Sequence, residues 1–214
     1  MGRRGKPLRR AGSSRPEQRR FLIYCEGECT EKQYFKGLNQ ELKSLPVTIC
    51  LGGTHGEPKS LVRAAIGHKR RAVNSAADRH TEYDEVWCVV DVEAPKQHSS
   101  LDEALALARE SGIKVALTNP CFELWILLHL RNVFAYHTSD GAQRVLEKES
   151  GCGYTVQRKH LDYAELQGAK GENYAAARKR ALTLRSKSES GHLANPWTDV
   201  DELVELLRAA RAKS

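Results

Sequence analysis

The sequence predicts an α/β fold in which a mostly parallel, four-stranded sheet is flanked by helices and followed by a helical C-terminal half. Short apolar runs alternate with amphipathic segments over residues 21–120, and several of these runs end at an acidic residue or a glycine. From residue 121 onward, only helical periodicity remains. Strands that alternate with helices pair in parallel through crossover connections, so we expect a sheet that is covered on both faces.

Four short, continuous apolar runs are expected to form the strands, as is typical of strands buried on both faces. They cover residues 21–25, 46–51, 86–91 and 113–117. The second run is closed by Gly52 and Gly53. The segment 52–60 resembles a phosphate-binding loop, but its lysine and serine do not follow the glycine directly, so we do not expect it to bind ATP.

Amphipathic segments predict the helices. After the first strand, Thr30 and Gln33 fit an N-cap and capping box, and apolar residues follow them at helical spacing. Further helices are expected at about 59–77, 101–108, 121–131, 139–149, about 159–166, 172–187 and 199–212. Trp197, just before the last of these, is expected to pack against it. We therefore predict a basic arm (1–20), an α/β core (21–135) and a helical extension (136–214) packed on the core.

The composition is that of a globular protein with one strongly charged segment. The net charge is +7, and residues 1–20 contain eight Lys or Arg and one Glu, so the remainder of the chain is neutral. Such an arm contacts nucleic acid phosphates or acts as a solubilising tail, and the sequence leaves both open. No apolar run approaches the roughly 20 residues that span a bilayer, so we expect a cytoplasmic protein with no membrane contact. The six cysteines show no metal-site spacing and are expected to be buried, reduced thiols.

Acidic residues follow two of the predicted strands at the point where each strand ends. Glu26 follows the first strand, Asp91 ends the third, and Glu93 comes two residues later. Ligands of parallel α/β sheets bind at the carboxyl ends of the strands, and Mg²⁺ prefers carboxylate oxygens. The sequence therefore predicts a magnesium site at this edge. The alternative is that each acid is a solvated loop residue.

Three segments resemble known families. The segment 21–35, with Glu26-Gly27 and Thr30-Glu31, resembles the first motif of Toprim-fold proteins, in the branch that includes the OLD-type nucleases. Asp91-Val92-Glu93 resembles the Asp-x-Asp motif of the same fold. The segment 119–130 is similar to the RloB family, and Tyr154 and residues 195–198 also fit that family. The resemblance covers roughly residues 20–210.

The resemblance implies a Toprim-like (Rossmann-like) fold and a metal-dependent nuclease, found near restriction-modification loci and linked to abortive phage infection. It implies Mg²⁺ or Mn²⁺ held by Glu26, Asp91 and Glu93. Glu31 holds a second metal in one interpretation and offsets the dipole of its helix in the other. Glu123 faces the site or caps its helix. Glu93 departs from the family pattern, since an Asp usually stands there, and its extra methylene shifts the carboxylate oxygens.

Nucleic acid, DNA or RNA, is the expected partner, and a separate ATPase or restriction-system partner is plausible by analogy with other phage-defence nucleases. The alternative function is a non-catalytic subunit that binds metal and nucleic acid alongside a partner protein. His129 is expected to be a core histidine and not a general base, because it lies more than one helical turn from Glu123. The sequence leaves open whether the chain forms a homo-oligomer.

Overall fold

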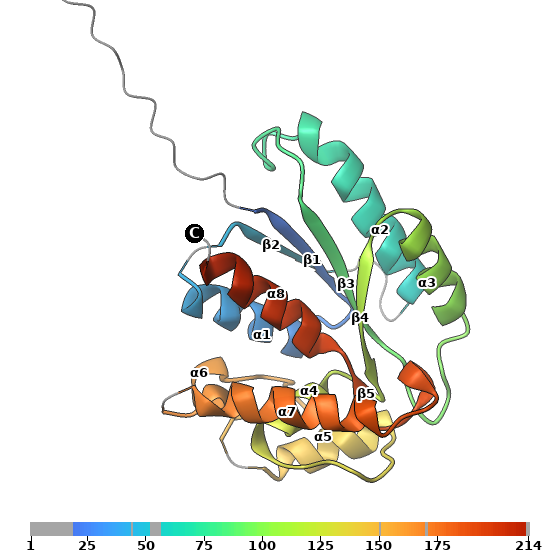
Figure 1. Cartoon of the computed structure of the whole chain (residues 1–214), viewed down its shortest axis with the longest axis vertical. Helices are drawn as coiled ribbons and strands as arrows, with labels where there is room; N and C mark the ends of the chain where they lie inside the picture. Colours follow the sequence, from blue (N-terminus) through green and yellow to red (C-terminus); the bar gives the residue numbers. More distant parts are fainter. Residues whose placement is uncertain (1–18, 44, 52–56, 150, 170, 213–214) are drawn as a thin grey trace, which may run out of the picture.

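A computed structural model describes residues 19–212 except 44, 52–56, 150 and 170 (Figure 1). Its centre is a five-stranded sheet in the order β2-β1-β3-β4-β5. The strands are β1 (Phe21–Cys25), β2 (Val47–Leu51), β3 (Glu85–Asp91), β4 (Lys114–Asn119) and β5 (Trp197–Thr198). The first four are mutually parallel, as predicted, and β5 pairs antiparallel with β4. The prediction of four strands was therefore wrong by this short fifth strand.

The sheet is built around β1 and β3. Phe21 is in register with Val47 of β2 and Glu85 of β3, so these strands begin together, and Asp91 at the end of β3 is in register with Thr118 of β4. All five residues of β1 are buried. This burial explains why β1 is continuously apolar and does not alternate between apolar and polar residues.

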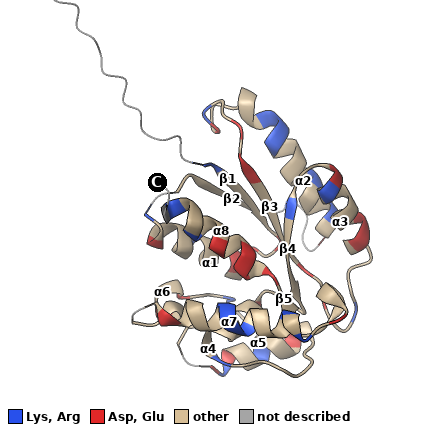
Figure 2. Ribbon diagram, in the orientation of Figure 1, with Lys and Arg blue, Asp and Glu red and all other residues tan. Residues whose placement is uncertain are grey.

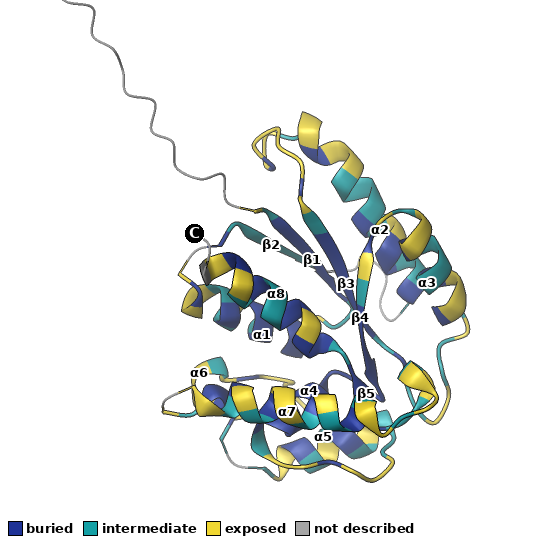
Figure 3. Cartoon of the chain, in the orientation of Figure 1, coloured by how far each residue is buried: buried dark blue, intermediate teal, exposed yellow. Residues whose placement is uncertain are grey.

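Helices cover both faces of the sheet (Figure 1). α2 (Pro58–Arg71) and α3 (Leu101–Glu110) pack against each other and contribute to an apolar cluster with one face of the strands. α1 (Thr30–Glu41) and α8 (Val200–Ala212) contribute to the cluster on the other face. The strands lie between these two layers and are largely buried (Figure 3).

The remaining helices form a further layer beside α1 and α8 (Figure 1). They are α4 (Glu123–Leu130), α5 (Ser139–Glu147), α6 (Tyr163–Gln167) and α7 (Glu172–Ser186). α4 is apolar around most of its circumference, and residues 123–129 are all buried. A helix of this kind needs neighbours on every side. Helices α5, α6 and α7 all contact it.

Several expected boundaries and contacts were wrong. The helix expected at 59–77 ends at Arg71 and continues as a 3₁₀ turn, Ala72–Asn74. The capping box at Thr30 is not formed, because Cys29 is the N-cap residue and no side chain caps that end. Trp197 lies in β5 and belongs to the apolar cluster on the α2 and α3 side, whereas α8 packs in the other cluster.

The expectations for the cysteines, the membrane, the basic arm and the domain division have different outcomes. All six cysteines are free thiols; four of them are buried, and Cys29 and Cys50 are half-buried. Among the described residues, every helix is too short or too polar to cross a membrane. Residues 1–18 of the basic arm and residues 52–56 lie outside the described residues. The division into arm, core and extension remains a prediction, and one apolar cluster contains residues of both the core and the extension.

Candidate metal centre

A pocket of about 330 Å³ opens at the carboxyl ends of β1 and β3, beside the first turns of α1 and α4. The five acidic residues predicted from the sequence all line it. The lining comprises Glu26, Gly27, Glu28, Cys29, Thr30, Glu31, Asp91, Glu93, Glu123, Gln143 and Lys159. The structure thus brings together acids that lie up to 97 residues apart, from Glu26 to Glu123.

Glu26 joins the two central strands where they end. Its backbone N–H donates to the carbonyl of Val89 at 3.2 Å, which continues the β1–β3 ladder by one step. Its carboxylate Oε2 accepts a hydrogen bond from the N–H of Asp91 at 3.1 Å. The other carboxylate oxygen, Oε1, lies 3.2 Å from Nε2 of His98. These contacts hold the Glu26 side chain across the end of β3.

Asp91 has a buried carboxyl group whose charge is not compensated, within the described part of the chain, by a hydrogen-bond donor at one of its oxygens. Its Oδ1 is buried and has no hydrogen-bond partner among the described residues. Burial and the neighbouring carboxylates, Glu31 first, raise the pKa of this carboxyl well above its ordinary value. A buried carboxylate oxygen without a donor is costly unless a cation or proton compensates its charge.

Glu31 sits in the first turn of α1, and its side chain folds back over the Glu-Gly turn. Its Oε1 accepts a hydrogen bond from the N–H of Gly27 at 2.9 Å. Burial and the charge of Glu123 raise its pKa to about 7. A Cβ atom at position 27 would lie 2.1 Å from Glu31 Oε2, so the glycine is needed for this close approach. The side chain therefore serves the pocket, while the acid still lies in the first turn of its helix.

Glu123 is buried at the start of α4 and is oriented by two hydroxyl groups. Its Oε1 accepts a hydrogen bond from Tyr154 at 2.9 Å and another from Thr30 at 3.2 Å. Phe122 is the N-cap residue of α4, and no side chain caps that end. Of the two roles expected for Glu123, the structure shows the one that faces the pocket.

Glu93 also lines the pocket, but its carboxylate is already engaged. Its Oε2 accepts a hydrogen bond from the hydroxyl of Ser139 at 2.5 Å. Its backbone φ is 71°, a left-handed value that is uncommon for a residue with a side chain. The backbone thus departs from an extended path at the position where Glu replaces the Asp of the family pattern.

Comparison with family models supplies the relationship of the chain to known proteins. The model described as RloB-like protein matches residues 21–207, which include every described strand and most of the helices. The chain belongs to the RloB-like family. Comparison with curated proteins and with solved structures gives no match.

Sequence reasoning missed several residues of this RloB-like pocket. His98, Ser139, Gln143 and Lys159 were not predicted, and Tyr154 was noted without a role. His98 lies in the segment that follows β3, so its position at the carboxyl edge was the available signal. The others come from the helical half, where only tertiary contacts could reveal them.

His129 is a core residue, as predicted. Its Nδ1 lies 2.9 Å from the carbonyl of Trp125, and its Nε2 lies 3.5 Å from the hydroxyl of Tyr34. Burial lowers its pKa to about 4, so it is neutral at physiological pH. It does not line the acidic pocket.

The pocket fits a divalent cation in donor type more closely than in side-chain placement. Its donors are carboxylate oxygens, which Mg²⁺ prefers, and the buried Asp91 Oδ1 lacks a partner. In the described part of the RloB-like chain, however, no three His, Cys, Asp or Glu side chains stand close enough together to hold a metal ion. Metal binding therefore requires these side chains to turn toward one another.

Proposed function

We propose that this RloB-like chain is a Toprim-type, Mg²⁺-dependent nuclease that hydrolyses phosphodiester bonds of nucleic acid. The observation that carries the proposal is the acidic pocket, where Glu26, Asp91 and four further acidic residues line one cavity at the carboxyl ends of parallel strands. Six acids around a pocket of about 330 Å³ repel one another unless protons or cations compensate their charge. We expect Mn²⁺ to support the same reaction when it is supplied in place of Mg²⁺.

Glu26 and Asp91 would hold the metal, with Glu93 as a further ligand and Glu31 beside a second ion. When bound, Mg²⁺ stabilises the negative charge that develops on the phosphoryl oxygens. Burial and the charge of Glu123 raise the pKa of Glu31 to about 7, and a cation bound beside it would offset that charge and favour its carboxylate as a ligand. Tyr154 and Thr30 hold Glu123 in place through their hydroxyl groups. Lys159, on the pocket wall, offers a positive charge to a substrate phosphate.

The biological setting follows from the family resemblance. We place the activity in phage defence by abortive infection, in the cytoplasm, with an ATPase or restriction-system protein as a partner. The basic arm adds six cations within residues 1–18 that are suited to binding phosphates, whereas Arg19 pairs with Glu85 and Arg20 donates to the carbonyls of Thr81 and Glu82. DNA and RNA both meet these chemical requirements.

A second candidate function is a non-catalytic subunit that binds metal and nucleic acid for a partner protein. The observation that favours it is the hydrogen bond between Glu93 and Ser139, at 2.5 Å, because it directs one carboxylate oxygen toward Ser139 and occupies one of its lone pairs. The left-handed backbone at Glu93 also favours this second function, because the extra methylene and the altered backbone path together move the carboxylate away from the position of the usual Asp.

Calorimetric titration with Mg²⁺ and Mn²⁺, followed by cleavage assays on plasmid, single-stranded DNA and tRNA, separates the two functions. The nuclease proposal predicts metal-dependent cleavage by the wild type and its loss in Glu26→Ala and Asp91→Ala. Glu110→Ala is the matched control, because Glu110 is an exposed acid at the end of α3. Metal binding without cleavage of any substrate would favour the non-catalytic function. Equal cleavage by all four proteins would contradict the assignment of the pocket.

A further inference from the structure

Two segments at the carboxyl end of the sheet carry exposed apolar side chains. Five large hydrophobic side chains are exposed in the described part of the chain, and three of them are Phe134 (63%), Tyr136 (57%) and Leu193 (56%). These three side chains are here called the aromatic patch. Phe134 and Tyr136 lie in the loop between α4 and α5, and Leu193 lies in the 3₁₀ turn Gly191–Leu193.

Hydrogen bonds join the two segments that carry the patch. The N–H of His137 donates to Asn195 Oδ1 at 3.1 Å, and Asn195 Nδ2 donates to the carbonyl of His137 at 2.8 Å. Asn119, the last residue of β4, donates through Nδ2 to the carbonyls of His192 and Leu193 at 3.1 and 3.4 Å. The patch is thus built on the carboxyl end of the sheet, where the acidic pocket also lies.

The loop continues from the patch directly into the pocket wall. Ser139, three residues after Tyr136, donates its N–H to the carbonyl of Ala94 at 3.0 Å and its hydroxyl to Glu93 at 2.5 Å. Three residues of extended chain span at most about 11 Å. A stacked strand advances about 3.4 Å per nucleotide, so Tyr136 lies within about three nucleotides of Ser139, which contacts the pocket residue Glu93.

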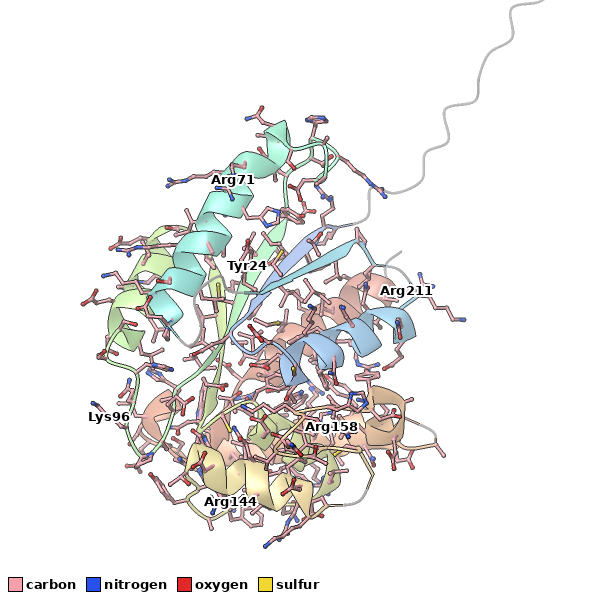
Figure 4. All side chains as sticks on the ribbon, turned by 180° about the vertical axis from the view of Figure 1, so that it is seen from behind. Tyr24, Arg71, Lys96, Arg144, Arg158 and Arg211 are labelled. Atoms are coloured by element: carbon pink, nitrogen blue, oxygen red, sulfur yellow. The ribbon has the colours of Figure 1, made fainter. Side chains whose placement is uncertain are left out.

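Positive charge accompanies the aromatic rings. The ammonium of Lys187, at the end of α7, lies 5.3 Å from the centre of the Phe134 ring. Lys96 is exposed two residues after Ala94, and Arg144 lies on α5; both are found toward the same end of the molecule (Figure 4). Further Lys and Arg residues lie along α7, in blue in Figure 2. Exposed rings next to cations suit a ligand that has both flat faces and phosphates.

We infer that the aromatic patch is a stacking platform for unpaired bases of a single-stranded nucleic acid whose backbone enters the acidic pocket. This inference rests on the proposed function and names the form of its substrate. Base stacking on exposed rings tolerates any sequence, while the nearby lysines contact the backbone. The faces of the bases in a duplex are covered by their neighbours, so the patch distinguishes unpaired from paired strands. Val133, next to Phe134, is buried and anchors the loop, which leaves the two rings free of any packing role in the core.

The test is a fluorescence-anisotropy titration of the full chain with a labelled thymidine oligonucleotide of about 12 nucleotides, its uridine counterpart, and a duplex of the same length. EDTA is present, so no metal-dependent cleavage occurs. The double variant Phe134→Ala/Tyr136→Ala is expected to bind both single strands at least about tenfold more weakly, with an unchanged salt dependence and unchanged duplex binding. Lys187→Ala is expected to reduce the salt slope by about 0.7 instead. Tyr136→Phe, which keeps the ring, should bind as the wild type does.

Val73→Ala is the matched control, because Val73 is 37% exposed in the 3₁₀ turn Ala72–Asn74, which follows α2 and not α4. Unchanged single-strand binding by the double variant overturns the inference, as does an equal loss of duplex binding. A wild-type dimer that dissociates in the double variant also overturns it, because the patch would then be an interface between two copies. If the wild type cleaves nucleic acid but the double variant binds single strands as tightly as the wild type does, only the role of the aromatic patch is contradicted. If the double variant binds single strands more weakly but the wild type cleaves no nucleic acid, only the proposed nuclease function is contradicted.

Discussion

The carboxylate of Glu26 accepts a hydrogen bond from the backbone N–H of Asp91 at 3.1 Å. This bond joins the residues that follow β1 and end β3, the two central strands of the sheet. Because the strands start in register and run in parallel, their ends reach the same edge, and the two carboxyl groups meet there. The acidic pocket is therefore a consequence of sheet topology, and side chains from the helical half complete it.

Gly27→Ala tests the close approach of Glu31 to the Glu-Gly turn. The new Cβ would lie 2.1 Å from Glu31 Oε2, so the carboxylate must move away. We expect metal affinity to fall about tenfold, with little loss of stability, because only the end of a flexible side chain is displaced. Gly67→Ala in α2 is the control, where the nearest atom is Arg71 Nη1 at 3.1 Å and metal affinity should not change. Wild-type metal affinity in Gly27→Ala would show that metal binding does not need the present position of the Glu31 carboxylate.

Tyr154→Phe tests whether the hydroxyl on Glu123 positions that carboxylate for catalysis. The substitution removes the donor, 2.9 Å from Glu123 Oε1, and keeps the ring. We predict that kcat falls about tenfold while KM changes little, which is typical of an interaction needed only in the transition state. Tyr174→Phe is the matched control, since its hydroxyl donates to Glu205 outside the acidic pocket. A purely structural role for Tyr154 would lower stability and leave kcat unchanged.

Asp78→Asn tests a polar network that lies outside the acidic pocket, in the segment that precedes β3. Asp78 is buried and accepts a hydrogen bond from the Tyr83 hydroxyl, while His68 Nε2 lies 3.1 Å from its Oδ1. The Tyr83 hydrogen bond, followed by that of His68, lowers the pKa of Asp78 to about 2. A lowered pKa stabilises the folded state above the unfolded value of about 3.9, and this contribution is lost as the pH falls toward 2.

Urea unfolding at several pH values measures this contribution. At pH 7 we expect Asp78→Asn to be less stable than the wild type by about 1.5–3 kcal/mol, the usual contribution of a hydrogen bond to a charged group. The difference should shrink as the pH falls from about 4 to 2, because the wild-type carboxylate then becomes protonated. A difference that is independent of pH would show that the charge of Asp78 does not contribute.

Substitutions at Arg185 and Asp201 test how the helical half is held against the sheet. The guanidinium of Arg185, at the end of α7, forms a two-pronged ion pair with buried Asp201 of α8 and donates to the carbonyl of Thr198 in β5 at 2.6 Å. Arg185→Met leaves the Asp201 charge buried without its partner, which should cost about 3–5 kcal/mol in the free energy of unfolding. Arg185→Met/Asp201→Leu should recover most of that loss. A double variant as unstable as the single one would contradict this explanation.

The sequence predicted the parts of the fold that depend on local pattern. Continuous apolar runs located β1 and β3, and the acids at their ends located Glu26 and Asp91. β5 was missed because two residues, Trp197 and Thr198, carry no periodicity and form a strand only through pairing with β4. The expected capping box failed because the hydroxyl of Thr30 donates to Glu123, 93 residues away, and not to its own helix.

Long-range contacts account for what the sequence could not predict in the candidate site. His98 approaches Glu26 from the segment after β3, and Tyr154 reaches Glu123 from the loop after α5. His98 had one sequence signal, its position just after β3, whereas the contact of Tyr154 depends on how the helical half packs beside the sheet. The roles of Glu31 and Glu123 were ambiguous for the same reason, since an acid in the first turn of a helix also stabilises that helix.

The most direct test of the proposed metal centre is a crystal structure of the protein soaked in Mn²⁺, with the ion located by its anomalous scattering. We predict an ion in the acidic pocket, bound by carboxylate oxygens of Glu26 and Asp91 at about 2.0–2.2 Å, with waters completing its octahedron. Asp91→Asn crystals soaked in the same way should show a weaker signal or none. A pocket that stays free of Mn²⁺ in wild-type crystals while the protein still cuts nucleic acid would contradict the account.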